Sequence, residues 1–124
     1  MQKLAFMVTT SIVDHFTKTA YQIVKNTLEQ GIEVTGVFFY QSGVTNASKL
    51  AQFPSDEVNL GLLWCELADT YNLDLHLCST AAEKYGLLSE DKTTTTTVLH
   101  DQFTISGLGE LVVLHEKADK LVQL

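Results

Sequence analysis

Cys78 is the residue whose type and position point most directly to chemistry. It ends a short apolar segment, Leu73–Cys78, that we predict to be a strand, and the segment Ser79–Glu83 directly after it is typical of a helix start. The first amide groups of a helix have no partner within it, and their partial positive charge favours a thiolate over a thiol. Because the thiolate is the form that attacks sulfur, this position predicts a reactive cysteine. The same pattern also fits a small buried side chain that fills a strand end.

Two of the four histidines could assist this thiol. His76 precedes Cys78 by two residues and therefore shares its face of the predicted strand, where it could stabilise a thiolate. A satisfied core or interface histidine is the alternative. His100 is followed by Asp101, a pair of the kind that activates nucleophiles, but it also follows a polar segment, where solvent exposure is the commoner outcome. We keep His76 and His100 as auxiliary candidates.

The second cysteine, Cys65, belongs to a predicted helix with two apolar faces. Val58, Leu62 and Cys65 lie at spacings of four and three residues, on a face different from the main stripe. Either the protein's own domain or a neighbouring subunit covers this face. We prefer the subunit, which makes Cys65 interface packing; a Cys65–Cys78 relay stays open, but nothing in the spacing demands it. The main stripe consists of Leu60, Leu63, Trp64, Leu67, Ala68 and Tyr71.

No metal or organic cofactor is expected. No His or Cys pair has the spacing of a metal site, so we reject one. Gly107-Leu108-Gly109 before a helix superficially suggests a phosphate cradle. The rest of a nucleotide fingerprint is missing, and these glycines come late in the chain, so a tightly packed turn explains them.

The composition narrows the class of protein. The chain has 124 residues, 45% hydrophobic and 19% charged, which predicts one globular domain over residues 1–124 with a core that needs no disulfides. A formal net charge of −7 argues against direct binding to nucleic acid or to an anionic membrane. With no signal peptide, no apolar run of membrane-spanning length and only two cysteines, we expect a cytoplasmic protein in a reducing compartment.

Strands and helices are predicted to alternate along the chain. This order predicts an α/β fold with a mostly parallel sheet and helices on both faces, in flavodoxin-like layering. The Thr9–Asp14 loop, the Gln41–Asn46 loop and Cys78 then fall at the carboxyl ends of the strands, where function gathers in such sheets. The predicted strands are 4–8, 32–40, 73–78 and 120–124. The predicted helices run from Asp14 to Leu28, from the acidic pair Asp56-Glu57 to Tyr71, from near Thr80 to about Tyr85, and from Glu110 to about Glu116. For the third helix, Thr80–Glu83 matches a capping box.

Several segments together resemble the DsrE/TusD family of sulfur-relay proteins, closest to its TusD-like members. They keep their order and spacing across nearly the whole chain. The segments are Val37–Ala47, Ser55-Asp56-Glu57 ahead of a Trp-bearing helix, Leu75–Ala82 with Gly86, Phe103–Gly109 and Asp119–Gln123.

The resemblance implies a DsrE-like fold and a sulfurtransferase subunit. Such a subunit accepts sulfane sulfur as a cysteine persulfide and passes it to a partner protein. The family's active cysteine falls on Cys78 here. The sulfur goes toward 2-thiolation of the wobble uridine of tRNA in TusD-like members, and into oxidative sulfur metabolism in DsrE-like members.

The resemblance also implies partners. Family members assemble with TusB- and TusC-like, or DsrH- and DsrF-like, small homologous subunits as a heterohexamer. A TusA-like protein is the upstream donor and a TusE- or DsrC-like protein is the downstream acceptor. The sequence leaves open which pathway is served, which donor and acceptor are used, and whether homo- or hetero-oligomers form.

Two segments depart from the family pattern. Thr9–His15 replaces the Gly- and Pro-containing loop expected after the first strand, and the five threonines Thr93–Thr97 read as an exposed loop or an edge segment. Two other functions stay open: a non-catalytic assembly subunit with a structural Cys78, and a binding site for a nucleotide-type ligand at the strand ends.

Overall fold

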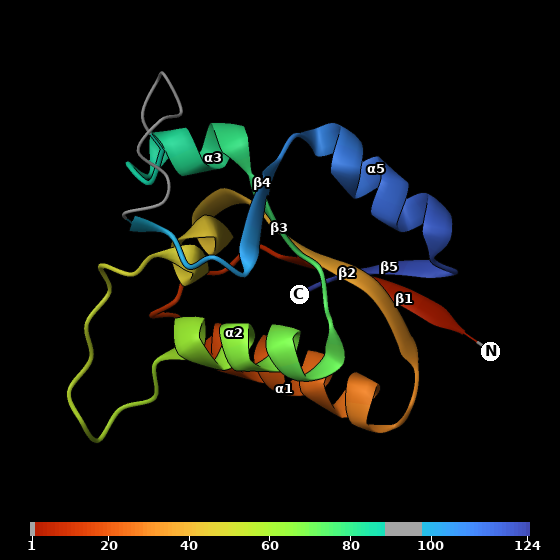
Figure 1. The fold of residues 1–124 in the computed structure, drawn as a ribbon, viewed down its shortest axis with the longest axis horizontal. Helices are drawn as coiled ribbons and strands as arrows, with labels where there is room; N and C mark the ends of the chain where they lie inside the picture. Colours follow the sequence, from red (N-terminus) through yellow and green to blue (C-terminus); the bar gives the residue numbers. More distant parts are fainter. Residues whose placement is uncertain (1, 89–97) are drawn as a thin grey trace.

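The computed structural model of the protein describes residues 2–88 and 98–124, so the Thr93–Thr97 prediction lies outside the described residues. Five strands form one sheet in the order β4-β3-β2-β1-β5, and every neighbouring pair is parallel (Figure 1). The predicted parallel α/β fold is therefore confirmed. The strands are β1 (Lys3–Val8), β2 (Glu33–Phe39), β3 (Leu75–Cys78), β4 (Phe103–Ser106) and β5 (Lys120–Gln123). The helices are α1 (His15–Glu29), η1 (Gln41–Ala47), α2 (Leu60–Tyr71), α3 (Ser79–Lys84) and α5 (Leu108–Lys117).

Helices cover both faces of the sheet. α1 and α2 lie side by side on one face, and α5 lies on the other (Figure 1). The central strands are buried on both sides, which is why Val37, Phe38 and Phe39 follow one another without a polar residue between them. α5 approaches β2 closely at Gly36, where an added Cβ would come 2.7 Å from the Leu114 side chain.

The core beneath η1 is built around Trp64 of α2. Its ring meets the rings of Tyr21 and Phe39 edge to face, at centroid distances of 5.2 and 5.1 Å. Its indole Nε1 donates a hydrogen bond of 3.2 Å to Oδ1 of the fully buried Asn46 in η1. This apolar cluster therefore also fixes a polar segment at the carboxyl edge of the sheet.

Two predicted segments differ in secondary structure. Gln41–Asn46 forms most of the 3-10 helix η1 and is not an open loop. The Thr45 hydroxyl donates to the Ser42 carbonyl and the Asn46 amide to the Gly43 carbonyl, so side chains supply bonds within its short turns. The segment 103–106, for which the sequence predicts no element, pairs with β3 as the edge strand β4.

One predicted helix start and one predicted capping box are wrong. α2 begins at Leu60 and not at the acidic pair, because the Asn59 side chain accepts a hydrogen bond from the Leu62 amide and caps the helix there. The third helix begins at Ser79 with Cys78 as its N-cap residue, so the Thr80–Glu83 capping box falls inside the helix. By contrast, α1 begins as predicted, capped by Asp14.

The second apolar face of α2 is covered differently from the prediction. Cys65 is 6% exposed within this single chain, so it belongs to the protein's own core and the prediction of interface packing is wrong for it. Val58 precedes the helix, so its predicted place on this face is wrong. Val58 and Leu62 are 47% and 55% exposed, and their coverage by another subunit stays a prediction. Within the described part of the chain, no helix is long and apolar enough to span a bilayer.

Candidate functional site

Three segments meet at the carboxyl edge of the sheet, as the parallel order requires. The loop after β1 is bonded to η1, which follows β2: the Ser42 hydroxyl donates to the Thr9 carbonyl at 3.0 Å, and the Ile12 amide donates to the Thr45 hydroxyl at 3.0 Å. The Asn46 amide also reaches the Thr10 carbonyl, at 3.2 Å. η1 is therefore held against the end of β1, beside the end of β3.

The backbone at the start of η1 is unusual in two places. Gln41 has a φ of +53°, a left-handed conformation that few residues other than glycine adopt. At Gly43, a Cβ atom would overlap with the carbonyl oxygen of Val8, so only glycine fits between η1 and β1. Together they turn the chain sharply after β2 and bring Tyr40 and Gln41 toward β3.

Cys78 is the last residue of β3 and the N-cap residue of α3. Its thiol makes no capping hydrogen bond, and the residue is 2% exposed. It borders a cavity of about 310 Å³, which is large enough for a small group beside this residue. The cavity is lined by Tyr40, Gln41, Cys78, Thr80, Ala81, Lys84, Tyr85 and Leu108.

The lining of this cavity suits an anionic sulfur group. Among the described residues that line it, Lys84 is the one that is charged, and Thr80, Tyr40 and Tyr85 bring hydroxyl groups. Sequence analysis did not single out Lys84 or Gln41. The spacing of Thr80 and Lys84, four residues apart on α3, is the signal that could have placed Lys84 on the side of the helix facing Cys78.

His76 shares a strand face with Cys78, as predicted from its spacing, but its ring is engaged elsewhere. Nδ1 lies 3.0 Å from the hydroxyl of Ser106 in β4, and Nε2 lies 3.7 Å from a carboxylate oxygen of Glu110 in α5. Its side chain is 12% exposed. His76 is not among the residues that line the Cys78 cavity.

The structure does not bring His100 into the Cys78 cavity either. Its backbone amide donates to the Ala47 carbonyl, and its ring lies close to Gly61 at the start of α2. Burial lowers the pKa of His100, and the nearby positive charge of Lys49 adds to this, while Asp101 acts in the opposite direction. In this place His100 would be neutral at pH 7.

Cys65 lies in the core on α2, on the other side of the sheet from α5. Burial raises the pKa of its thiol to about 11, with smaller contributions from the negative charges of Asp69 and Asp101. It is therefore a poor nucleophile at neutral pH. Among the residues that the structure describes, no three His, Cys, Asp or Glu side chains form a group that could hold a metal ion.

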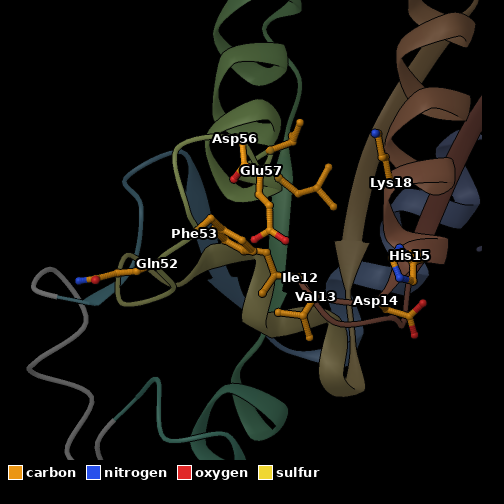
Figure 2. A pocket seen from close by; sticks show the side chains of 11 residues that line it. Ile12, Val13, Asp14, His15, Lys18, Gln52, Phe53, Asp56 and Glu57 are labelled. Atoms are coloured by element: carbon orange, nitrogen blue, oxygen red, sulfur yellow. The ribbon is translucent and has the colours of Figure 1, made fainter.

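A second cavity, of about 500 Å³, lies between the start of α1 and the segment before α2. Figure 2 shows His15 and Lys18 of α1 on one side of it and Phe53, Asp56 and Glu57 on the other, with Ile12 and Val13 between them. Its lining contains acidic, basic and apolar side chains together, and none of the described residues that line it also lines the Cys78 cavity. The described residues in its lining include no cysteine and have charges of both signs, so we assign it no function.

The sequence is similar to known proteins across most of its length. A family model described as the DsrE/DsrF-like family matches residues 2–124. The protein named "Putative sulfurtransferase DsrE" of Allochromatium vinosum is 41% identical over 108 residues, which cover 84% of this chain and 83% of that protein. A sulfurtransferase TusD homolog of Pasteurella multocida is 42% identical over 108 residues, with 85% of both chains covered. The sulfurtransferase TusD of Proteus mirabilis is 37% identical over 109 residues, with 85% of this chain and 84% of that protein covered.

Among solved structures, the ychN protein from E. coli has a similar fold. The two structures align with a TM-score of 0.80 over all of both chains, at 20% sequence identity. At this identity the likeness shows the fold alone.

Proposed function

Since the chain belongs to the DsrE/DsrF-like family, we propose that it is a sulfurtransferase subunit that accepts sulfane sulfur as a persulfide on Cys78. The observation that supports this residue is its placement: the thiol ends β3, precedes α3 and borders a cavity that contains Lys84. The naming of the relatives as sulfurtransferases supports the sulfur-relay role itself.

The proposed chemistry is two exchanges between sulfur atoms. The Cys78 thiolate attacks the outer sulfur of an incoming persulfide, a new S–S bond forms, and the donor leaves as a thiolate. An acceptor thiolate then attacks the outer sulfur on Cys78 and regenerates the Cys78 thiolate. Since an S–S bond is about 2.05 Å long, the transferred sulfur would extend from Cys78 into the adjoining cavity. Lys84 in the lining would favour the anionic form of that sulfur.

The partners belong to the proposal as well. We infer assembly with TusB- and TusC-like or DsrH- and DsrF-like subunits, sulfur supply by a TusA-like donor, and delivery to a TusE- or DsrC-like acceptor. Because Cys78 is nearly covered, the acceptor has to present its cysteine on a slender segment that enters the cavity. Both tRNA thiolation and oxidative sulfur metabolism would use the same thiol.

One observation favours a second candidate function. Only 2% of Cys78 is exposed, which also fits a non-catalytic assembly subunit in which this cysteine is structural. The two functions differ in whether Cys78 takes up sulfur.

Intact-protein mass spectrometry tests this directly. The protein is incubated with a cysteine desulfurase, cysteine and a sulfur-carrier protein, together with the predicted partner subunits. Wild type, Cys78→Ser and Cys65→Ser are compared. We expect the mass of one additional sulfur atom on wild type and Cys65→Ser, and none on Cys78→Ser, because Cys65 is enclosed and protonated.

Cys65→Ser is the matched control, since it removes the other thiol of the chain. An adduct that persists in Cys78→Ser would refute the assignment of the residue. No adduct on any variant, with Cys78 also slow to alkylate, would favour the assembly subunit.

A further inference from the structure

His76 joins three elements next to the Cys78 cavity. It lies on β3, its Nδ1 contacts the Ser106 hydroxyl on β4 at 3.0 Å, and its Nε2 lies 3.7 Å from Glu110 on α5. Glu110 is in the first turn of α5. One partly buried side chain therefore links the strand that bears Cys78 to the beginning of the helix that follows β4.

The linked segment includes part of the cavity wall. Ser106 is the register partner of Cys78 across the β3–β4 pair. Two residues later, Leu108 begins α5 and lines the cavity. In Figure 1 the start of α5 and the whole of α3 lie at the same end of the sheet, beyond β3 and β4. Leu108 comes from the α5 side of the cavity, and Lys84 and Tyr85 come from the α3 side.

Leu108 lies at an open part of the described structure. It is about half exposed, and among the described residues no atom beyond the neighbouring backbone lies within 4 Å of where a Cβ of Gly107 or Gly109 would be. Gly107, the N-cap residue of α5, has no side chain to cap the helix, and its carbonyl accepts a hydrogen bond of 3.1 Å from the Glu110 amide. The contacts of His76 with Ser106 and Glu110 thus lie on both sides of this glycine-flanked leucine.

We propose that His76 is a positioning residue for the Cys78 site: through Ser106 and Glu110 it holds the start of α5 so that Leu108 closes one side of the cavity. This role, which rests on the proposed function of Cys78 as the sulfur carrier, is not direct stabilisation of the Cys78 thiolate. His76 instead controls which molecules reach Cys78. With Leu108 in place, the narrow entrance of the cavity admits a slender acceptor segment and excludes bulky thiols.

The hydrogen bonds around His76 fit this role. When the ring is protonated, Nδ1–H donates to the Ser106 oxygen, and the Ser106 hydroxyl can donate to the Thr104 carbonyl at 3.5 Å. The Nε2–H then faces Glu110 with opposite charge. Every polar hydrogen of the ring is thereby directed at β4 or α5, and none at Cys78.

Alkylation with reagents of two sizes tests the proposal. The rates at Cys78 are measured at pH 7 with iodoacetamide and with a fluorescein maleimide, and peptide mapping separates Cys78 from Cys65. In His76→Ala we expect the rate with the bulky reagent to rise about fivefold or more relative to that with iodoacetamide, since losing a contact of ordinary strength shifts an opening equilibrium by about that factor. Leu108→Ala should reproduce the rise, and Glu110→Gln should give a smaller one.

Three controls separate positioning from general loosening of the fold. His115→Ala removes an exposed histidine from the same helix and should leave both rates at Cys78 unchanged. His76→Asn keeps a polar atom near the position of Nδ1 and should restore most of the size selectivity. Cys65, buried in the core, reports on global opening, so its rate should stay at the wild-type value in every variant.

The proposal would be overturned if the ratio of the maleimide rate to the iodoacetamide rate at Cys78 stayed unchanged in His76→Ala, Glu110→Gln and Leu108→Ala. It would also be overturned if the alkylation rate at Cys65 rose together with that at Cys78. Glu110→Gln keeps the test decisive if His76→Ala does not fold, since Glu110 is partly exposed on α5. Alkylation needs neither sulfur donor nor acceptor. A negative result here leaves persulfide formation on Cys78 intact, and a negative persulfide result leaves this one valid.

Discussion

The substitution Asn46→Asp probes how the carboxyl edge of the sheet is held together. Asn46 is fully buried, and its Nδ2 donates to the carbonyls of Gly43 at 2.9 Å and Thr10 at 3.2 Å. Its Oδ1 accepts from Trp64 Nε1. An aspartate has nearly the same shape and keeps the bond from Trp64, but in its ionised form it cannot donate to either carbonyl.

The expected cost follows from these contacts. Two lost hydrogen bonds account for about 2 kcal/mol, and a buried charge that faces two carbonyl oxygens raises the total to about 3–5 kcal/mol at pH 7. This would be a large part of the stability of a domain of this size, which is typically about 5–15 kcal/mol. Burial raises the pKa of such a carboxyl in the folded state, so the loss should shrink as the pH falls toward about 4.

Urea unfolding followed by Trp64 fluorescence, at pH 7 and pH 5, measures both effects. Asn26→Asp is the matched control, because it makes the same chemical change at an exposed position of α1, where less than about 0.5 kcal/mol is expected. A free energy of unfolding for Asn46→Asp within about 1 kcal/mol of wild type at pH 7 would refute the reasoning, since it would mean that the bonds to Gly43 and Thr10 do not stabilise η1.

Two further predictions concern stability. Gly43→Ala should cost about 3 kcal/mol or more in urea unfolding, because its Cβ would overlap with the rigid Val8 carbonyl; a loss below about 1 kcal/mol would contradict this packing. Alkaline pH should destabilise the protein through Cys65. In the unfolded chain the Cys65 thiol loses its proton near the ordinary pKa of 9.0, whereas in the folded protein it keeps the proton until its pKa of about 11. The free energy of unfolding therefore falls as the pH rises from about 9 to about 11. Cys65→Ala should flatten the dependence of the unfolding free energy on pH between 9 and 11, and an unaltered slope would disprove the assignment.

Sequence patterns were sufficient for four of the described strands, β1, β2, β3 and β5, and for the place of Cys78 at the end of β3. Apolar runs such as Val37–Phe39 identify buried parallel strands, and the alternation of strand and helix forces their carboxyl ends to one edge. The sequence patterns failed where a single local interaction determines the start of a helix or where a strand lies at the edge of the sheet. Asn59 starts α2 by capping it, although the acidic pair before it is the stronger sequence signal, and β4 has exposed Thr104 where a central strand would be apolar.

The cavity was beyond sequence reasoning because its lining comes from four elements. Gln41 enters it through a left-handed backbone, Lys84 through the far end of α3, and Leu108 through the first turn of α5. No periodicity relates residues so far apart in the chain. His76 shows the same limit: its strand face follows from spacing, but its partners Ser106 and Glu110 follow only from the register of β4 and the path of α5.

The contrast between the two cysteines bears on what a sulfur carrier requires. A second thiolate within reach of a persulfide would attack its inner sulfur, form a disulfide and release hydrosulfide, so the transferred sulfur would be lost. Here Cys65 lies on α2, whereas Cys78 shares the face of β3 that His76 turns toward α5, so the sheet separates the two thiols. The pKa of Cys65, raised to about 11 by burial, keeps it protonated at neutral pH. Under the proposed function, this separation leaves sulfur on Cys78 no second thiol within the chain to take it, so it passes to a partner protein beside the cavity that Leu108 and Lys84 border.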